Sequence, residues 1–374
     1  MIISTLKEIK NNENRVALTP QGVKELVKNT HKVIVQKNAG SDAGFSDESY
    51  IQAGATIVEK PIDIIKQADL LIKVKEPTQE EYELLDNFRG KVLFTYLHLA
   101  AADKRLAEKL LENKIISICY ETVEDKKGNL PLLKPMSQIA GVLSIQYGAE
   151  YLQRKYGGLG ITLGKIDNAP LAEVLVIGGG NVGAAAARTA AGMGAHVTLL
   201  DINDKKIQEL KEEFFNYNNI TLLKSTKKTL AEQIKKADLV IGAVLVAGAK
   251  TPIVVTEDMV DLMKKGAVMV DVAIDQGGCI CVSRPTTHDN TIFKVNDKIC
   301  CCITNMPGQV ALQSTQALTN ATLPYLLEMA NKGVLEALRK DKNFARGLNT
   351  YNGNITCKAV AESLGMLDKY REFM

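Results

Sequence analysis

The sequence predicts an α/β protein made of two doubly wound domains, and three observations support this. Apolar strand-like runs alternate with helical stretches in two successive series, a pattern typical of parallel sheets covered by helices. A glycine-rich turn at residues 178–183 directly follows one such run. The chain has 374 residues, which is longer than a single hydrophobic core usually supports.

The first series occupies the N-terminal third of the chain. β-branched and other apolar residues predict strands over residues 32–36, 70–74, 91–96 and 115–119. Helices are expected between them, since Pro20 and Pro61 occupy positions typical of a first helical turn and residues 102–112 carry apolar residues at helical spacing. This alternation predicts a parallel sheet.

One long helix is predicted over residues 136–156, ended by the glycines at 157–160, and it is expected to bridge the domains. A second series follows, with strands predicted over residues 172–177, 196–201, 220–224, 239–243, 267–270 and 299–304. Six strands separated by helices form a complete dinucleotide-binding layout.

After Pro307 and Gly308, only helices are predicted, with no further strand. Because so few helices do not readily bury a core of their own, we expect them to return to the first domain. The predicted substrate domain is therefore discontinuous, residues 1–135 with 307–374, and is flavodoxin-like or Rossmann-like. Residues 136–306 are predicted to form the NAD-binding Rossmann domain, with long helices joining the two.

The composition favours a soluble globular enzyme. A formal net charge of +3 is too small to give the strong positive potential that attracts nucleic acid. Hydrophobic residues make up 46% of the chain, which is enough to build sizeable cores. No apolar run reaches the roughly 18 residues that cross a bilayer, and the first residues lead into charges instead of a signal-peptide core. We therefore expect a cytoplasmic protein without nucleic-acid or membrane partners.

Seven cysteines, three of them consecutive at residues 300–302, do not resemble a disulfide framework, so reduced thiols are expected. Cys279, Cys281 and His288 could suggest a metal site. No paired C-x-x-C spacing supports that reading, so burial is favoured and no metal is expected.

The turn at residues 178–183 has the spacing G-x-G-x-x-G. Gly178 permits a tight turn, Gly180 lets the backbone approach a pyrophosphate, and Gly183 lets the following helix pack closely on the sheet. Asn181 and Val182 begin that helix, whose N-terminal N–H groups and dipole favour an anion. This segment is therefore predicted to bind the cofactor.

The next predicted strand ends in Asp201, where an adenosine ribose would lie. A carboxylate there accepts hydrogen bonds from the ribose hydroxyls and repels a 2′-phosphate, so NAD is favoured over NADP. The alternative, in which the glycines only shape a turn and Asp201 caps the next helix, is weaker because the whole βαβ unit is present. Lys206 could hold the cofactor or lie on a solvated face.

Four polar residues follow predicted strands, where ligands of open α/β sheets bind: Arg15, Lys75, His98 and Asp275. Arg15 can grip a substrate carboxylate bidentately and Lys75 can add a point charge. An imidazole such as that of His98 exchanges protons near neutral pH. Asp275 could activate a water that attacks an imine or hold the nicotinamide end. On local features alone, Lys75 could instead be a solvated charge and His98 a half-buried residue.

Taken together, several strings in order resemble the alanine dehydrogenase family over nearly the whole chain. The matching strings lie at residues 7–13, 15–20, 74–77, 94–100, 132–137, 271–278, 283–288 and 305–308. Several separate motifs are much harder to match by chance than one glycine turn.

The resemblance implies that Arg15 and Lys75 bind substrate and that His98 and Asp275 are the acid–base residues. It implies cofactor contacts from Ser137, Gly180, Asn181, Asp201, Lys206, Ser225, Val244, Leu245, Val272, Ala273, Ile274, Asp275, Arg284, Ile303, Thr304, Asn305 and Met306. The implied activity is reversible, NAD-dependent oxidative deamination of L-alanine to pyruvate and ammonia. The implied assembly is a homohexamer.

Other functions stay open: the NAD-binding subunit of a proton-translocating transhydrogenase, a non-enzymatic NADH sensor, or a relative acting on ornithine or lysine. The set of Arg15, Lys75 and His98 argues against the first two, since neither needs an amino-acid pocket. The chain departs from the family at residues 311–313, where a Pro-Arg pair is usual, and at Thr30, where a glycine is frequent.

Overall fold

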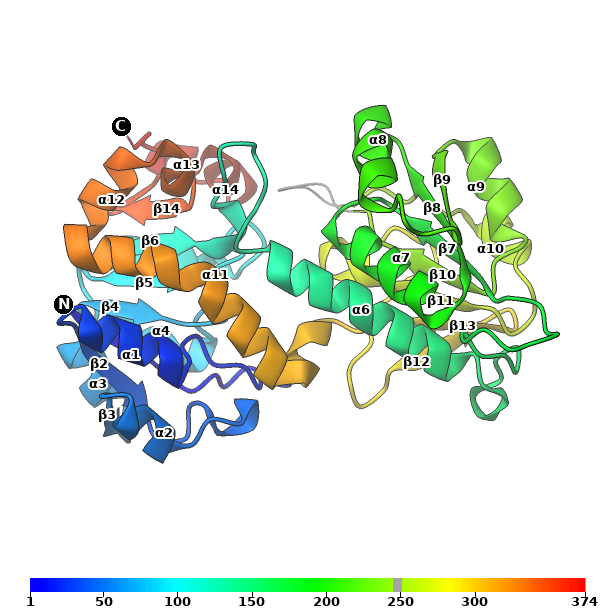
Figure 1. Ribbon diagram of the computed structural model, residues 1–374. Helices are drawn as coiled ribbons and strands as arrows, with labels where there is room; N and C mark the ends of the chain where they lie inside the picture. The colour runs from blue at the N-terminus through cyan, green and yellow to red at the C-terminus, as the bar shows by residue number, and fades with distance from the viewer. Residues whose placement is uncertain (245–250, 374) are drawn as a thin grey trace. The chain divides into compact units, whose positions relative to one another are not determined.

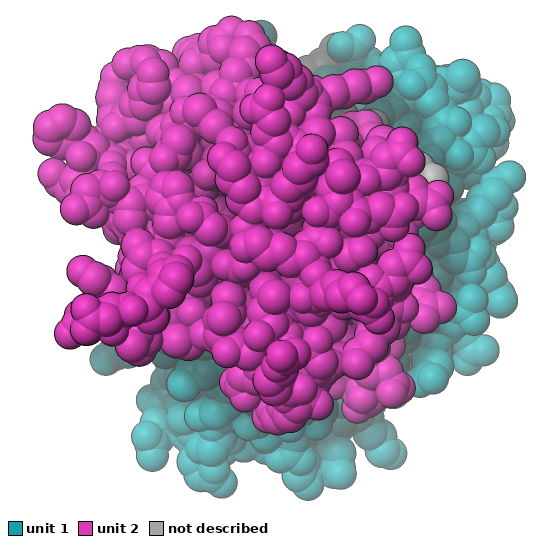
Figure 2. All heavy atoms as spheres, turned by 90° about the vertical axis from the view of Figure 1, so that its right-hand side faces the viewer, with its two compact units in different colours: residues 1–136, 308–374 teal, residues 137–307 magenta. Residues whose placement is uncertain are grey.

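The computed structural model describes residues 1–244 and 251–373, which form two compact units (Figures 1 and 2). Unit 1 comprises Met1–Met136 and Gly308–Met374, and unit 2 comprises Ser137–Pro307. The C-terminal segment thus belongs to the same compact unit as the N-terminus, and unit 1 is discontinuous in sequence.

The sheet of unit 1 has a parallel core in the order β3-β2-β1-β4-β5-β6. Its strands are β1 (Ile2–Thr5), β2 (Lys32–Gln36), β3 (Thr56–Val58), β4 (Leu70–Ile72), β5 (Val92–Thr95) and β6 (Ile116–Cys119). This is the Rossmann order, so the predicted doubly wound, Rossmann-like fold of this domain is confirmed. The order reverses between β1 and β4, which creates a switch point at the carboxyl ends of these two strands.

The prediction that no strand follows Pro307 is wrong. β14 (Leu348–Tyr351) pairs antiparallel with β6 and forms a hairpin with β15 (Asn354–Ile355), as Figure 1 shows for β14 and β6. The hairpin turns at Asn352 and Gly353, whose φ angles are 48° and 77°. Asn-Gly favours this left-handed turn, and the added strands cover the edge that β6 would otherwise expose.

Helices cover both faces of this sheet. Successive residues of a strand point to opposite faces, so their packing partners show what covers each face. Leu71 and Leu93 belong to a core cluster with α3, α4, α5 and α14, whereas Phe94 lies edge-on to Tyr120 and Phe344 on the other face. The helices of unit 1 are α1 (Pro20–Lys28), α2 (Asp47–Gln52), α3 (Pro61–Gln67), α4 (Tyr82–Leu85), α5 (Lys104–Glu112), α11 (Ala311–Lys332), α12 (Val334–Lys340), α13 (Lys342–Ala345) and α14 (Lys358–Ser363).

Thr30, which stands where the family often has glycine, adopts a left-handed conformation with φ 65°. It follows α1, where the Thr30 N–H donates to the Val27 carbonyl and the His31 N–H donates to the Leu26 carbonyl. These are the bonds of a Schellman turn, in which glycine avoids the strain of a Cβ. The substitution changes the residue but keeps the turn.

The sheet of unit 2 has the same parallel order, β9-β8-β7-β10-β11-β13, with β12 antiparallel at one edge. Its strands are β7 (Glu173–Ile177), β8 (His196–Asp201), β9 (Ile220–Lys224), β10 (Leu239–Gly242), β11 (Val268–Asp271), β12 (Ile292–Val295) and β13 (Lys298–Cys301). The predicted Rossmann fold is therefore confirmed, and the bounds of β8 and β9 agree with the prediction.

Helices also cover both faces of the second sheet. They are α6 (Lys134–Tyr151), α7 (Asn181–Met193), α8 (Asp204–Glu213), α9 (Lys227–Ile234) and α10 (Glu257–Asp261). The helix predicted over residues 136–156 is α6, which ends at Tyr151 and is followed by a separate 3₁₀ turn at Arg154–Tyr156. None of the helices in the described ranges has the length and apolar character needed to cross a bilayer.

Candidate active site

In unit 1 the predicted substrate residues follow three adjacent strands. Arg15 lies in the loop after β1, Lys75 follows β4 and His98 follows β5. The first two therefore flank the switch point, where open α/β sheets bind their ligands. This position depends on strand order, which the sequence alone did not determine.

Arg15 is buried and held by a carboxylate of its own loop. Its Nε donates to Glu13 Oε1 at 2.6 Å and its Nη2 to Glu13 Oε2 at 2.5 Å, while Nη1 lies 3.0 Å from Met136 Sδ. Burial alone would lower the pKa of Arg15, but the Glu13 carboxylate raises it above its usual value. The guanidinium is thus a permanent, oriented charge whose Nε–Nη2 edge is occupied by Glu13.

Lys75 lies close enough to Arg15 for the two charges to interact. Burial lowers the pKa of Lys75 below its usual value and Arg15 lowers it further, although Glu13 and Glu76 act in the opposite direction. Glu76 also binds Lys10 at 2.5 Å. Lys75 is therefore not the solvated strand-end charge of the alternative reading, and it gives up its proton more readily than a surface lysine does.

A buried ion network lies directly behind Lys75. Lys73 Nζ is 3.2 Å from Glu8 Oε2 and 2.7 Å from Glu81 Oε1, and its side chain is 1% exposed. The other Glu8 oxygen accepts the N–H groups of Val74 at 2.6 Å and Lys75 at 3.3 Å. Glu8 thus links the buried charge of Lys73 to the backbone that presents Lys75.

His98 presents a half-exposed imidazole, with 47% of its side chain accessible. Its φ is 45°, an uncommon conformation for a residue with a side chain. The ring stacks on Tyr96 with centroids 6.0 Å apart, and Nδ1 lies 3.5 Å from Glu121 Oε1. An imidazole in this position is accessible to a substrate, as a residue that exchanges protons must be.

In unit 2 the glycine turn has the geometry of a pyrophosphate cradle. Gly178 has φ 102°, and a Cβ on Gly183 would lie 1.8 Å from the Gly178 carbonyl oxygen, so α7 packs against the turn as only glycine allows. A Cβ on Gly180 would meet nothing within 4 Å. The space before Gly180, at the uncapped N-terminus of α7, suits the approach of an anion.

Asp201 at the end of β8 is oriented by two backbone groups. Its Oδ2 accepts the Gly179 N–H at 2.7 Å and its Oδ1 accepts the Asn203 N–H at 2.8 Å. Asn203, and not Asp201, caps α8, because its side chain accepts the N–H groups of Lys205 and Lys206. The capping alternative for Asp201 is therefore wrong, and its carboxylate lies beside the glycine turn.

Asp275 is exposed on the 3₁₀ turn after β11, and a buried aspartate holds that turn in place. Asp271 Oδ1 accepts the Ala273 N–H at 3.1 Å, while Oδ2 accepts the N–H of Cys279 at 2.8 Å and the hydroxyl of Ser283 at 2.6 Å. The structure therefore places Asp275 in unit 2, at the carboxyl edge of the sheet that carries the glycine turn.

The other predicted cofactor residues of unit 2 mostly follow its parallel strands. Ser225 follows β9, Val244 follows β10, Val272, Ala273 and Ile274 follow β11, and Ile303, Thr304, Asn305 and Met306 follow β13. Three differ: Ser137 lies in α6, Lys206 lies in α8 with its Nζ 3.4 Å from Glu209, and exposed Arg284 stacks 4.4 Å from the Phe293 ring. Leu245 lies outside the described residues.

Gly180 permits a direct test of the cofactor site. Gly180→Ala is expected to raise the Kd for NADH about tenfold or more, because its methyl group enters only the space that the pyrophosphate would occupy. Titration of NADH fluorescence measures this Kd. Gly192→Ala is the matched control, since Gly192 lies in the last turn of α7, the helix that Gly180 precedes, and its Cβ would also meet nothing within 4 Å. Equal Kd values for the two variants would contradict the assignment.

The cysteines carry no reactive-thiol signature. All seven are free, and burial raises the pKa of Cys300 to about 12 and that of Cys302 to about 11. A thiol with a raised pKa stays protonated and is a poor nucleophile or ligand. Within the described ranges no group of three or more His, Cys, Asp or Glu side chains could hold a metal ion.

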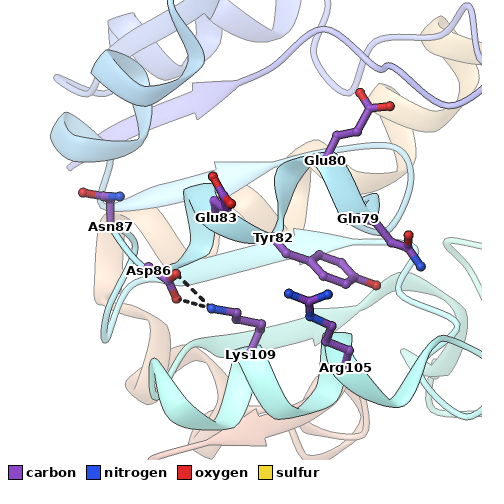
Figure 3. A pocket seen from close by; sticks show the side chains of 8 residues that line it. All are labelled: Gln79, Glu80, Tyr82, Glu83, Asp86, Asn87, Arg105 and Lys109. Atoms are coloured by element: carbon purple, nitrogen blue, oxygen red, sulfur yellow. Dashed lines mark hydrogen bonds and ion pairs between the residues drawn. The ribbon is translucent and has the colours of Figure 1, made fainter.

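A separate pocket of about 660 Å³ lies on unit 1 around α4 and α5 (Figure 3). None of the predicted site residues lines it, and Lys109 in it is paired with Asp86 at 2.9 Å. Its lining residues are Gln79, Glu80, Tyr82, Glu83, Asp86, Asn87, Arg105 and Lys109. Because none of the predicted site residues lines this pocket, we assign it no role in the chemistry.

The sequence reading missed the carboxylates that hold the predicted residues. Glu13 holds Arg15, Glu8 holds the backbone of Lys75 and Glu121 lies beside His98. One signal was available in the sequence: Lys73 and Asp271 interrupt otherwise apolar runs of residues. A charge inside such a run requires a buried partner and so predicts a polar network.

Two family models match the chain. The model described as "Alanine dehydrogenase/PNT, N-terminal domain" matches residues 4–140, and "Alanine dehydrogenase/PNT, C-terminal domain" matches residues 144–358. Among curated relatives, the alanine dehydrogenase of Mycolicibacterium smegmatis is 50% identical over 366 residues, covering 98% of this chain and 97% of the relative. That of Methanococcus maripaludis is 48% identical over 364 residues, covering 97% and 96%.

Solved structures agree with these matches. A structure titled "L-alanine dehydrogenase" superposes with a TM-score of 0.92 at 43% identity, covering 98% of this chain and 99% of that one. A transhydrogenase from Sinorhizobium meliloti superposes with a TM-score of 0.80 at 23% identity, covering 96% and 100%. The second likeness shows a shared fold alone.

Proposed function

The chain belongs to the alanine dehydrogenase/PNT family, and we propose on that basis that it converts L-alanine, NAD⁺ and water into pyruvate, ammonium, NADH and a proton, reversibly. It is thus an NAD-dependent oxidoreductase acting on a CH–NH₂ group. The cation pair of buried Arg15 and half-buried Lys75 at the switch point of unit 1 carries the substrate assignment. A site for a small carboxylate needs such charges, whereas nucleotide-to-nucleotide hydride exchange does not.

The two cations bind the carboxylate that alanine and pyruvate share. Glu13 orients the guanidinium of Arg15 through Nε and Nη2, and this fixed cation is proposed to attract the substrate carboxylate. Lys75 adds a charge beside the carboxylate or the developing carbonyl oxygen. Because Arg15 and Lys75 act on the substrate from different positions, together they fix the orientation of its Cα.

Unit 2 is proposed to be the cofactor domain and unit 1 the substrate domain. Gly180 and the N-terminus of α7 receive the pyrophosphate, and Asp201 receives the ribose hydroxyls of NAD. When bound, NAD⁺ accepts a hydride from Cα of alanine, which leaves an imine. Val244 after β10 and the predicted residues after β11 and β13 would line the nicotinamide end.

His98 and Asp275 are proposed to move the protons. The alanine amine must first lose a proton, and a water must then add to the imine carbon, which needs a base. The oxygen of that water becomes the carbonyl of pyruvate, and protonation of the nitrogen lets ammonia leave. His98 exchanges these protons, while Asp275 orients and activates the water.

We also propose a cytoplasmic homohexamer. Seven free cysteines suit a reducing compartment. The oligomer rests on the family resemblance. In the segment that replaces the usual Pro-Arg pair, Ala311 is 6% exposed and Leu312 is 51% exposed, so this departure changes one buried position and the surface beside it.

The test is NADH formation, followed by absorbance, by the purified protein with NAD and L-alanine at alkaline pH. L-serine, L-ornithine and NADP are the comparison substrates, and we expect turnover with L-alanine and NAD to exceed all of them. Tight NADH binding without turnover on any amino acid would instead favour the transhydrogenase-like or sensor alternatives. Faster turnover of L-ornithine than of L-alanine would change the proposed substrate from alanine to ornithine.

A further inference from the structure

His98 needs support that its own packing does not supply. Its imidazole is about half exposed and its backbone has φ 45°, a conformation costly for a residue with a Cβ. Tyr96 contacts one face of the ring, but stacking fixes neither the tautomer nor the rotation of the ring in its plane. Another group must therefore hold the backbone of this turn and determine the orientation and tautomer of the ring.

Glu121 provides such support from the adjacent strand. It lies in the 3₁₀ turn Tyr120–Thr122 that follows β6, and β6 pairs with β5, the strand before His98. Both carboxylate oxygens accept the Leu97 N–H, each at 3.2 Å, and Oε1 also accepts the His98 N–H. One largely buried carboxylate, 15% exposed, thus binds two successive N–H groups of the His98 turn.

The same carboxylate faces the imidazole. Oε1 lies 3.5 Å from His98 Nδ1, a separation that can shorten in a substrate complex. A carboxylate beside Nδ1 favours a proton on that nitrogen, which leaves Nε2 to take and give protons. Among the described residues, Glu121 is the acidic residue whose carboxylate pairs with the His98 imidazole.

We propose that Glu121 is the positioning residue of the deamination reaction, holding the His98 turn and keeping a proton on Nδ1 so that Nε2 faces the substrate. This inference rests on the proposed function, because it assigns Glu121 a role only through His98. Glu121 itself need not touch substrate or cofactor.

The first experiment measures kcat and KM for L-alanine in Glu121→Gln and Glu121→Asp. Glu121→Gln keeps the shape but removes the charge, and we expect kcat to fall about 10-fold to 100-fold, as for other residues that orient an imidazole. NADH affinity should stay unchanged, since the cofactor residues lie in unit 2. Glu121→Asp should recover part of kcat. The matched control is Glu124→Gln, which removes only the surface pair with Arg346.

A double-mutant cycle separates positioning from a general structural role. In a His98→Gln background, Glu121→Gln should cause no further loss of kcat, because the residue through which it acts is already absent. Additive losses, or a Glu121→Gln enzyme with the parental kcat, would overturn the inference. If Glu121→Gln does not fold, the same cycle is run with Glu121→Asp.

The outcomes for the two proposals differ. A parental protein that turns over L-alanine while the cycle is additive retains the proposed function and overturns only the role of Glu121. A parental protein without turnover on any amino acid overturns the proposed function, and the role of Glu121 with it.

Discussion

Lys75→Ala is expected to lower kcat/KM for L-alanine and for pyruvate about 10²-fold to 10³-fold, the loss typical when one preorganised charge is removed from a reacting centre. The side chain of Lys75 is half-buried and its ammonium interacts with the Arg15 guanidinium, so alanine at this position removes one charge of the cation pair. Steady-state kinetics in both directions measure the effect. NADH binding should be unchanged, because the residues proposed to hold the cofactor belong to unit 2.

Lys66→Ala is the control for this prediction, since Lys66 is an exposed lysine of the same unit. Lys75→Arg adds a second check: it keeps the charge but changes its shape, and we expect only partial recovery. Lys75→Ala activity within a few-fold of the parental enzyme would show that Lys75 is a structural charge and remove it from the substrate site.

Lys73→Met is expected to lower the free energy of unfolding by about 3–5 kcal/mol, the usual consequence of leaving buried charges without their partner. Burial alone would lower the pKa of Lys73, but Glu8 and Glu81 raise it, so the ammonium is the charge that keeps both carboxylates inside the protein. Burial already raises the pKa of Glu8. Urea unfolding, followed by far-UV circular dichroism or by the fluorescence of the 11 tyrosines in this tryptophan-free chain, measures the change.

The control is Lys24→Met, an exposed lysine on α1, whose substitution should alter stability by no more than about 0.5 kcal/mol. Adding Glu8→Gln and Glu81→Gln to Lys73→Met should restore part of the lost stability by removing the unpaired charges. A Lys73→Met protein as stable as the Lys24→Met control would mean that the network does not stabilise the fold.

Prediction of the fold succeeded where local pattern and tertiary environment agree. β8 and β9 match their predicted bounds because apolar parallel strands between helices are recognisable from sequence alone. The prediction failed for β14. This strand is short and polar, with the sequence Leu348-Asn349-Thr350-Tyr351, and it forms only by pairing with β6. A strand of that kind is stabilised by its neighbour more than by its own residues.

The sequence by itself determined the fold class, the cofactor turn and the four candidate residues, because each depends on short-range features: apolar spacing, glycine positions and the residues that end strands. Only the tertiary structure decided the strand order that brings Arg15 and Lys75 to one switch point, and the pairing of Glu8 with the backbone of Lys75 and with Lys73. Glu8 and Lys73 are 65 residues apart, and Glu121 follows a different strand from His98. No local pattern encodes such pairs, because their energy arises only when the folded chain removes the charges from water.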